Sequence, residues 1–143
     1  MALDRTEREQ FLAEPHVAAI AISSGADGER APLTLPIWYQ YAPGGDIWIM
    51  TGRDSRKAQL IKEAGRFSLM VDRLDPTIRY VSVEGPVVSI EAASREHLVE
   101  VASRYLPAEK VDGYVDFAWR DHGEQLVIHM RPERWLSSDL GAV

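Results

Sequence analysis

The sequence contains no cysteine. This absence excludes disulfide bonds, zinc–thiolate sites, iron–sulfur clusters and a cysteine nucleophile. Basic residues are also scarce, because 16 of them face 22 acidic residues and leave a net charge of −6. A nucleic-acid-binding protein needs a basic face to neutralise phosphates, so the charge argues against a nucleic-acid partner.

Long apolar runs are missing as well. The longest one, residues 17–22, is far shorter than the roughly 20 residues that a membrane-spanning helix requires. Residues 1–10 are rich in charge and lack the apolar segment of a signal peptide. We therefore expect a cytoplasmic protein without a membrane span. The histidines are scattered and have no acidic partner at ligand spacing, so we predict no metal site.

What the chain does have is enough apolar material for a core. It is 143 residues long and 45% hydrophobic, which predicts one domain over residues 1–143. The hydrophobic patterns predict strands at residues 16–23, 31–41, 47–51, 67–71, 78–90 and 124–131, and helices at 4–13, 55–64, 94–106 and 111–120. The sequence has no repeated βαβ unit, no Gly-x-Gly-x-x-Gly and no Walker loop, which disfavours a doubly wound nucleotide-binding fold. The order of elements predicts a mainly β (α+β) fold, a six-stranded antiparallel barrel with flanking helices.

Prolines fall inside two of these predicted strands. Pro36 cannot donate a hydrogen bond to a neighbouring strand, so we expect it at an open edge or a bulge. Gly85 and Pro86 lie within the strand predicted at residues 78–90, and they predict a bend or a bulge there.

The segment with the most chemical information follows the third predicted strand. Gly52 turns the chain, and a helix then begins with the hydroxyl of Ser55 and the cations of Arg56 and Lys57. Cations at this end of a helix are unfavourable, since its free N–H groups already carry partial positive charge. A bound phosphate would explain them, because it could accept hydrogen bonds from all of these groups. The alternative interpretation is that these cations, with Arg53, are solvated surface charges paired with nearby carboxylates.

Four segments together resemble one known family. They are Ser-Arg-Lys-Ala at residues 55–58, Pro-Ile-Trp-Tyr at 36–39, Tyr-Val-Ser-Val-Glu-Gly-Pro-Val at 80–87 and Arg-Pro-Glu-Arg-Trp at 131–135. In this order they resemble the pyridoxamine-phosphate-oxidase-like split-barrel flavoproteins over roughly residues 11–135. The resemblance implies a split β-barrel that forms a homodimer, with a flavin or deazaflavin in the cleft between the two barrels.

The resemblance also implies roles for individual residues. Thr51 and residues 55–57 match the positions that hold the cofactor phosphate, and residues 36–39 match the strand whose backbone faces the ring system. Trp135, supplied by the partner chain, would cover a ring edge. The implied cofactor-binding residues are therefore Pro36, Ile37, Trp38, Tyr39, Thr51, Ser55, Arg56, Lys57 and Trp135.

The sequence departs from the vitamin B6 oxidases of this family. It has no counterpart of the arginine and histidine that those enzymes use on the substrate phosphate, and the chain is shorter. It is more similar to the subgroup that uses the deazaflavin coenzyme F420, with FMN as the alternative. The leading hypothesis is an F420-dependent reductase that transfers a hydride to a small unsaturated or quinone-like substrate. The alternatives are an FMN-dependent oxidase or reductase, a carrier of a cofactor or haem, and a dimeric structural or regulatory domain. No side chain can be assigned as a catalytic acid or base from the sequence.

Overall fold

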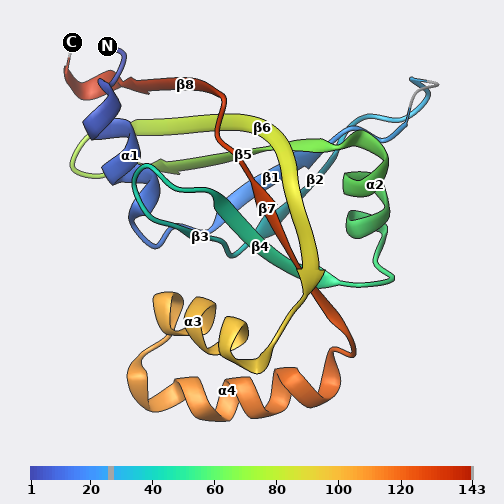
Figure 1. The fold of residues 1–143 in the computed structure, drawn as a ribbon. Helices are drawn as coiled ribbons and strands as arrows, with labels where there is room; N and C mark the ends of the chain where they lie inside the picture. The colour runs from blue at the N-terminus through green and yellow to red at the C-terminus, as the bar shows by residue number, and fades with distance from the viewer. Residues whose placement is uncertain (26–27, 143) are drawn as a thin grey trace.

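An eight-stranded sheet, antiparallel in all its pairings, forms the body of the protein (Figure 1). The structure is a computed structural model and describes residues 1–25 and 28–142. Strands run in the order β2-β1-β5-β6-β7-β4-β3, and β8 pairs with β6. The strands are β1 (Ala18–Ile22), β2 (Leu33–Ile37), β3 (Gln40–Tyr41), β4 (Ile47–Gly52), β5 (Arg66–Arg73), β6 (Arg79–Ala92), β7 (Gln125–Met130) and β8 (Arg134–Asp139).

Four α-helices flank this sheet in the described part of the chain. They are α1 (Arg5–Ala13), α2 (Arg56–Ala64), α3 (Arg95–Tyr105) and α4 (Ala108–Asp121), and a short 3-10 helix, η1 (Leu140–Ala142), follows β8. Figure 1 shows α3 and α4 packed together on one side of the sheet, with α1 and α2 at its two ends. The sheet curls into a half-barrel with these helices around it, so the predicted mainly β split-barrel architecture is confirmed.

The half-barrel does not close, because β2 is one edge strand of the sheet and the short β3, beside β4, is the other. In the described chain β2 pairs with β1 alone, and β4 pairs with β7 and, over Ile47 and Trp48, with β3, so β2 and β4 share no ladder. Pro36 lies on β2 opposite Ala19, and β2 is an edge strand, as the missing N–H of proline predicted. The opening between β2 and β4 is called the seam below.

Two predictions about the strands were wrong. The segment predicted as one strand at residues 31–41 forms two, β2 and β3, because the chain leaves the ladder at Trp38 and Tyr39. There the side chain of Tyr39 turns into the core, where its hydroxyl donates to the carbonyl of Leu12 at 2.6 Å. The other is β8, which was not predicted, so the sheet has eight strands and not six.

Side chains of β4 are buried on both faces of the sheet. Ile47 and Ile49 belong to the core cluster inside the barrel. Trp48 belongs to a second cluster with residues of α3 and α4, and Met50 packs against it. Helices α3 and α4 therefore cover the outer face of β4, and the barrel core covers its inner face.

The long strand β6 joins the two halves of the sheet. Its first half pairs with β5 and β8, and its second half pairs with β7. The change comes at Gly85 and Pro86, and the pairing with β7 shifts register between Val87 and Ser89. The predicted bend or bulge is thus confirmed.

The buried carboxylate of Asp139 connects the end of β8 to the start of β6 by hydrogen bonds. Asp139 accepts hydrogen bonds from Arg79 Nε at 2.8 Å, from Thr77 Oγ1 at 2.9 Å and from the Gly141 amide at 3.0 Å. Burial acts to raise the pKa of Asp139, but these donors outweigh it and hold the pKa below its ordinary value.

We expect Asp139→Asn to destabilise the protein at neutral pH. A carboxylate with a lowered folded-state pKa stabilises the fold above the unfolded-state pKa of about 3.9, and this contribution is lost as the pH falls through the folded-state value. Urea unfolding should therefore give a lower free energy of unfolding for the variant than for the wild type at pH 7. In acid, below the folded-state pKa of Asp139, this difference should become small. An equal separation at both pH values would contradict this assignment.

Candidate functional site

The start of α2 is built by a local hydrogen-bond network. Ser55 is the N-cap, and its side chain accepts from the Ala58 amide at 3.1 Å. The Thr51 hydroxyl lies 3.1 Å from the Ser55 hydroxyl, which ties the end of β4 to the cap. Serine is a preferred N-cap because its oxygen satisfies one of the free amides of the first turn. The other free amides remain available to a ligand.

Two cations at this helix end have no partner in the described chain. Arg56 is exposed and Lys57 is half-buried, and neither forms a hydrogen bond or an ion pair with any described residue. Burial lowers the pKa of Lys57, because the charged amine has lost part of its hydration without gaining a counter-ion. Arg53 differs, since it forms an ion pair with Glu124 at 2.7 Å. Arg53 is therefore a paired surface charge, Arg56 is an exposed charge without a described partner, and Lys57 is neither fully solvated nor paired.

A cavity of about 340 Å³ opens beside the seam. The ends of β2 and β4 border it, and α3 and α4 close it from the other side. Its wall is mostly apolar, with polar groups from α4 and β7. We call it the seam pocket, and it is lined by Val17, Pro36, Ile37, Trp38, Met50, Leu98, Val101, Tyr114, Ala118, His122 and Gln125.

Trp38 packs against two aromatic rings in the wall of the seam pocket. It stacks on Tyr105 with ring centroids 4.8 Å apart and contacts Tyr114 at 5.5 Å. The Tyr105 hydroxyl donates to the carbonyl of His16 at 2.7 Å and accepts from the amide of Tyr39 at 3.1 Å. The hydroxyl therefore fixes both the ring of Tyr105 and the chain on which Trp38 lies.

We expect Tyr105→Phe to cost about 1–3 kcal/mol of unfolding free energy, since it leaves the Tyr39 amide and the His16 carbonyl without this partner. Urea unfolding measures the loss. Tyr80→Phe is the matched control, because the Tyr80 hydroxyl forms no hydrogen bond with the described residues. Equal stability of the two variants would show that the Tyr105 hydroxyl does not hold this wall.

The seam pocket and the start of α2 adjoin through Gly52. Gly52 ends β4 and lies opposite Gln125, a residue of the pocket wall. A Cβ built on Gly52 would be 3.7 Å from Gln125 Nε2 and 3.8 Å from Ser55 Cβ. Gly52 therefore lies between the start of α2 and the wall of the seam pocket.

Comparison with known proteins settles the family. The sequence profile described as pyridoxamine 5'-phosphate oxidase matches residues 5–139. The chain belongs to the pyridoxamine 5'-phosphate oxidase family. This confirms the resemblance inferred from the sequence motifs, and it places the chain among flavin-binding oxidoreductases.

Solved structures share the fold of this pyridoxamine 5'-phosphate oxidase family member. An F420 reductase aligns with a TM-score of 0.69 at 22% identity, over 90% of this chain and 94% of its own. A conserved hypothetical protein from Mycobacterium tuberculosis aligns with a TM-score of 0.71 at 25% identity, over 97% of this chain and 86% of its own. A FAD-binding protein from Mesorhizobium loti aligns with a TM-score of 0.62 at 15% identity, over 97% and 95%. The curated proteins gave no match.

The structure brings the predicted site residues of this family member into two adjoining groups. Thr51 and residues 55–57 lie together at the start of α2, while residues 36–38 lie in the wall of the seam pocket. Tyr39 is placed differently, because its ring is fully buried and burial raises the pKa of its hydroxyl. The backbone of Tyr39 is engaged as well, since its amide donates to the Tyr105 hydroxyl at 3.1 Å and its carbonyl accepts from that hydroxyl at 3.2 Å.

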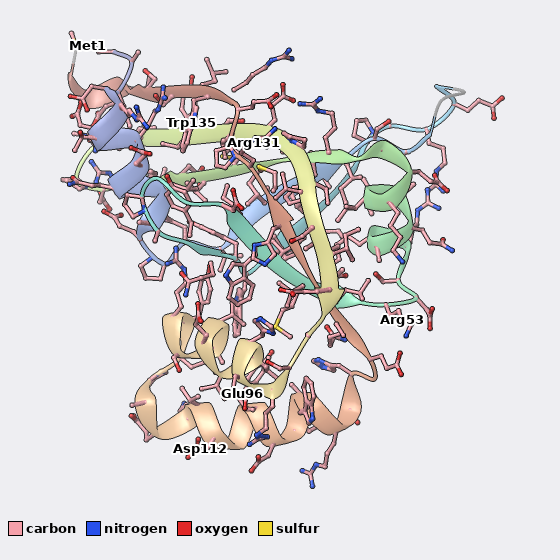
Figure 2. The ribbon with its side chains drawn as sticks, viewed as in Figure 1. Met1, Arg53, Glu96, Asp112, Arg131 and Trp135 are labelled. Atoms are coloured by element: carbon pink, nitrogen blue, oxygen red, sulfur yellow. The ribbon has the colours of Figure 1, made fainter. Side chains whose placement is uncertain are left out.

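Trp135 lies apart from both groups. It is on β8, and Figure 2 shows it on the far side of the strands from Arg53, which precedes α2. Its half-buried ring packs against its own chain, with the Arg8 guanidinium 4.7 Å from the ring centroid and the Tyr41 ring centroid at 6.4 Å.

Sequence reasoning missed the part of the seam pocket that α3 and α4 supply. Tyr114, Ala118 and His122 recur every four residues along α4, so they share a helix face, and this spacing was the available signal. Among the described residues, no cluster of histidine, aspartate and glutamate could hold a metal ion. No helix in the described ranges is both long and apolar enough to span a membrane.

Proposed function

We propose that this chain is an oxidoreductase that binds the deazaflavin coenzyme F420 and transfers a hydride between the reduced coenzyme and a small unsaturated or quinone-like substrate. The observation that carries the proposal is the half-buried, unpartnered Lys57 at a capped helix start that adjoins an apolar pocket. FMN is the second candidate, because its phosphate would be held by the same groups.

The residues of this chain fit such a cofactor. The free amides of the first turn of α2, with Arg56 and Lys57, would hold the phosphate through charge-assisted hydrogen bonds. Trp38, fixed by Tyr105, and the apolar wall around it would orient a ring and exclude water. The cofactor supplies the hydride chemistry, so the protein needs to provide mainly position and a dry pocket.

A homodimer is part of the proposal. On the outer face of the sheet, the register places Pro36, Ala19, Met70, Ser82 and Leu136 in one row across five strands. The row is small or apolar, and Met70 and Leu136 are exposed in the single chain. Because Pro36 also lines the seam pocket, a second copy on this row would border the cofactor site. Light scattering during size-exclusion chromatography should give twice the mass of the chain.

The direct test is a titration of the purified protein with F420 and, separately, with FMN. We expect saturable binding of F420 with a Kd below about 100 μM. Tighter binding of FMN would favour the second candidate. Binding without oxidation of the reduced coenzyme by any quinone or enone tested would indicate a carrier. Failure to bind either compound would overturn the proposal.

A further inference from the structure

A second cavity, of about 280 Å³, lies between α1, the β3–β4 loop and the start of β8. We call it the arginine pocket, since Arg5, Arg8 and Arg131 line it, with Tyr41 and Trp135 as aromatic walls. Figure 2 shows Arg131 and Trp135 close together and well away from the start of α2. Within one chain, the arginine pocket is therefore distinct from the seam pocket, with which it shares no lining residue.

The guanidinium of Arg8 lacks a polar partner. It lies over the ring of Trp135 at 4.7 Å, and its Nε is buried without a hydrogen bond. It forms no ion pair with a residue in the ranges that the structure describes. A guanidinium has five N–H donors in a planar fork that matches carboxylate and phosphate, so an arginine in this state favours an oxyanion as ligand.

The neighbouring carboxylates that the structure describes do not pair with Arg8, and they pair only weakly with Arg131. Glu9 is already engaged, because it accepts from the Gly44 amide at 3.1 Å and lies 3.5 Å from Arg5 Nε. Arg131 has only a long contact, 3.6 Å, with Glu133, and both side chains are largely exposed. Exposed pairs of this kind contribute little, so Arg131 is available to a ligand. Asp46 also borders the cavity and opposes an anion there.

We propose that the arginine pocket binds a small organic anion, a carboxylate or a phosphate ester, between Arg8 and Arg131. The two guanidiniums come from α1 and from the segment between β7 and β8, so the anion would join elements far apart in the sequence. Tyr41 and Trp135 supply apolar surface for the organic part. Within one chain the arginine pocket is separate from the proposed phosphate site, because no residue at the start of α2 lines it.

The test is an NMR titration of the ¹⁵N-labelled full chain with inorganic phosphate and, separately, with benzoate. We expect saturable shifts of the Gly44 and Gly45 amides and the Trp135 indole with at least one probe. Arg131→Gln should weaken this binding about tenfold or more, since it removes a charge-assisted contact. Arg8→Gln should do the same, and Asp46→Asn should strengthen binding. A stronger response to benzoate would identify a carboxylate as the ligand, and a stronger response to phosphate a phosphate ester.

Two variants distinguish this site from others. Arg134→Gln removes an exposed arginine that follows Arg131 closely in sequence but does not line the pocket, and it should leave the shifts unchanged. Lys57→Ala should also leave them unchanged, even where it abolishes cofactor binding. If neither probe produces the shifts at concentrations up to about 20 mM, which corresponds to a binding free energy weaker than about 2.3 kcal/mol, the proposal is overturned. Shifts that persist in Arg131→Gln, a variant of an exposed side chain whose fold is not at risk, would overturn it equally.

Discussion

Replacing Gly85 by alanine is expected to destabilise the protein strongly. A Cβ at this position would overlap the carbonyl oxygen of Arg131, and it would lie 2.8 Å from the carbonyl carbon of Arg131 and 3.2 Å from Met130 Sδ. The obstacle is backbone, which cannot rotate away as a side chain can. Since β6 changes partners here, a shift of either strand would disturb both halves of the sheet. We expect a loss of about 3 kcal/mol or more, a large share of the usual 5–15 kcal/mol.

Gly113→Ala is the matched control for this prediction. Gly113 is an exposed residue of α4, and a Cβ there would meet nothing within 4 Å. The same substitution should raise the unfolding free energy by up to about 1 kcal/mol, because alanine favours the helix more than glycine does. Circular dichroism and urea unfolding of both variants provide the measurement. A Gly85→Ala protein as stable as the wild type would show that β6 and Arg131 do not approach so closely.

The parts of the fold that depend on local pattern could be predicted from the sequence. The helix α2 has a serine cap, an apolar face and Gly65 in the left-handed conformation at its end, and each signal lies within a few residues of the others. Strand β8 has no such signal, since Leu136 at its centre faces outward and serines follow. Its place is fixed by pairing with β6, where Trp135 lies opposite Val83, a contact between residues distant in the sequence.

The same distinction between local sequence and long-range contacts applies to the candidate site. The proposed phosphate-binding groups at the start of α2 follow one another along the chain, so the local sequence was enough to place Ser55, Arg56 and Lys57 together at a helix start. The seam pocket requires β2 and β4 to lie near each other without pairing, and it requires α4 to fold back over them. No local pattern determines that arrangement. The contact between Trp135 and Arg8 of the same chain joins residues far apart in the sequence, so no local pattern indicates it.

Lys57→Ala is expected to reduce the affinity for F420 and for FMN at least tenfold. A hydrogen bond between a charged donor and an anion contributes about 1.5–3 kcal/mol, which corresponds to roughly a 10–100-fold change in Kd. The fold should not suffer, because the amine is half-buried without a partner and its burial lowers its pKa. Fluorescence titration of the wild type and the variant with each cofactor measures the effect.

Lys62→Ala is the control from the same helix, since Lys62 is exposed in the last turn of α2 and lies away from the cap. It should bind both cofactors as the wild type does.

The free energy of unfolding of the Lys57→Ala variant, compared with that of the wild type, should also depend on pH. Below the lowered pKa, the wild type holds a poorly hydrated charge in the folded state, and this penalty disappears as the pH rises toward the ordinary lysine value of about 10.4. Any stability advantage of Lys57→Ala should therefore narrow with rising pH. Unchanged cofactor affinity in a folded Lys57→Ala protein would remove the phosphate from the start of α2, and with it the basis of the proposed function.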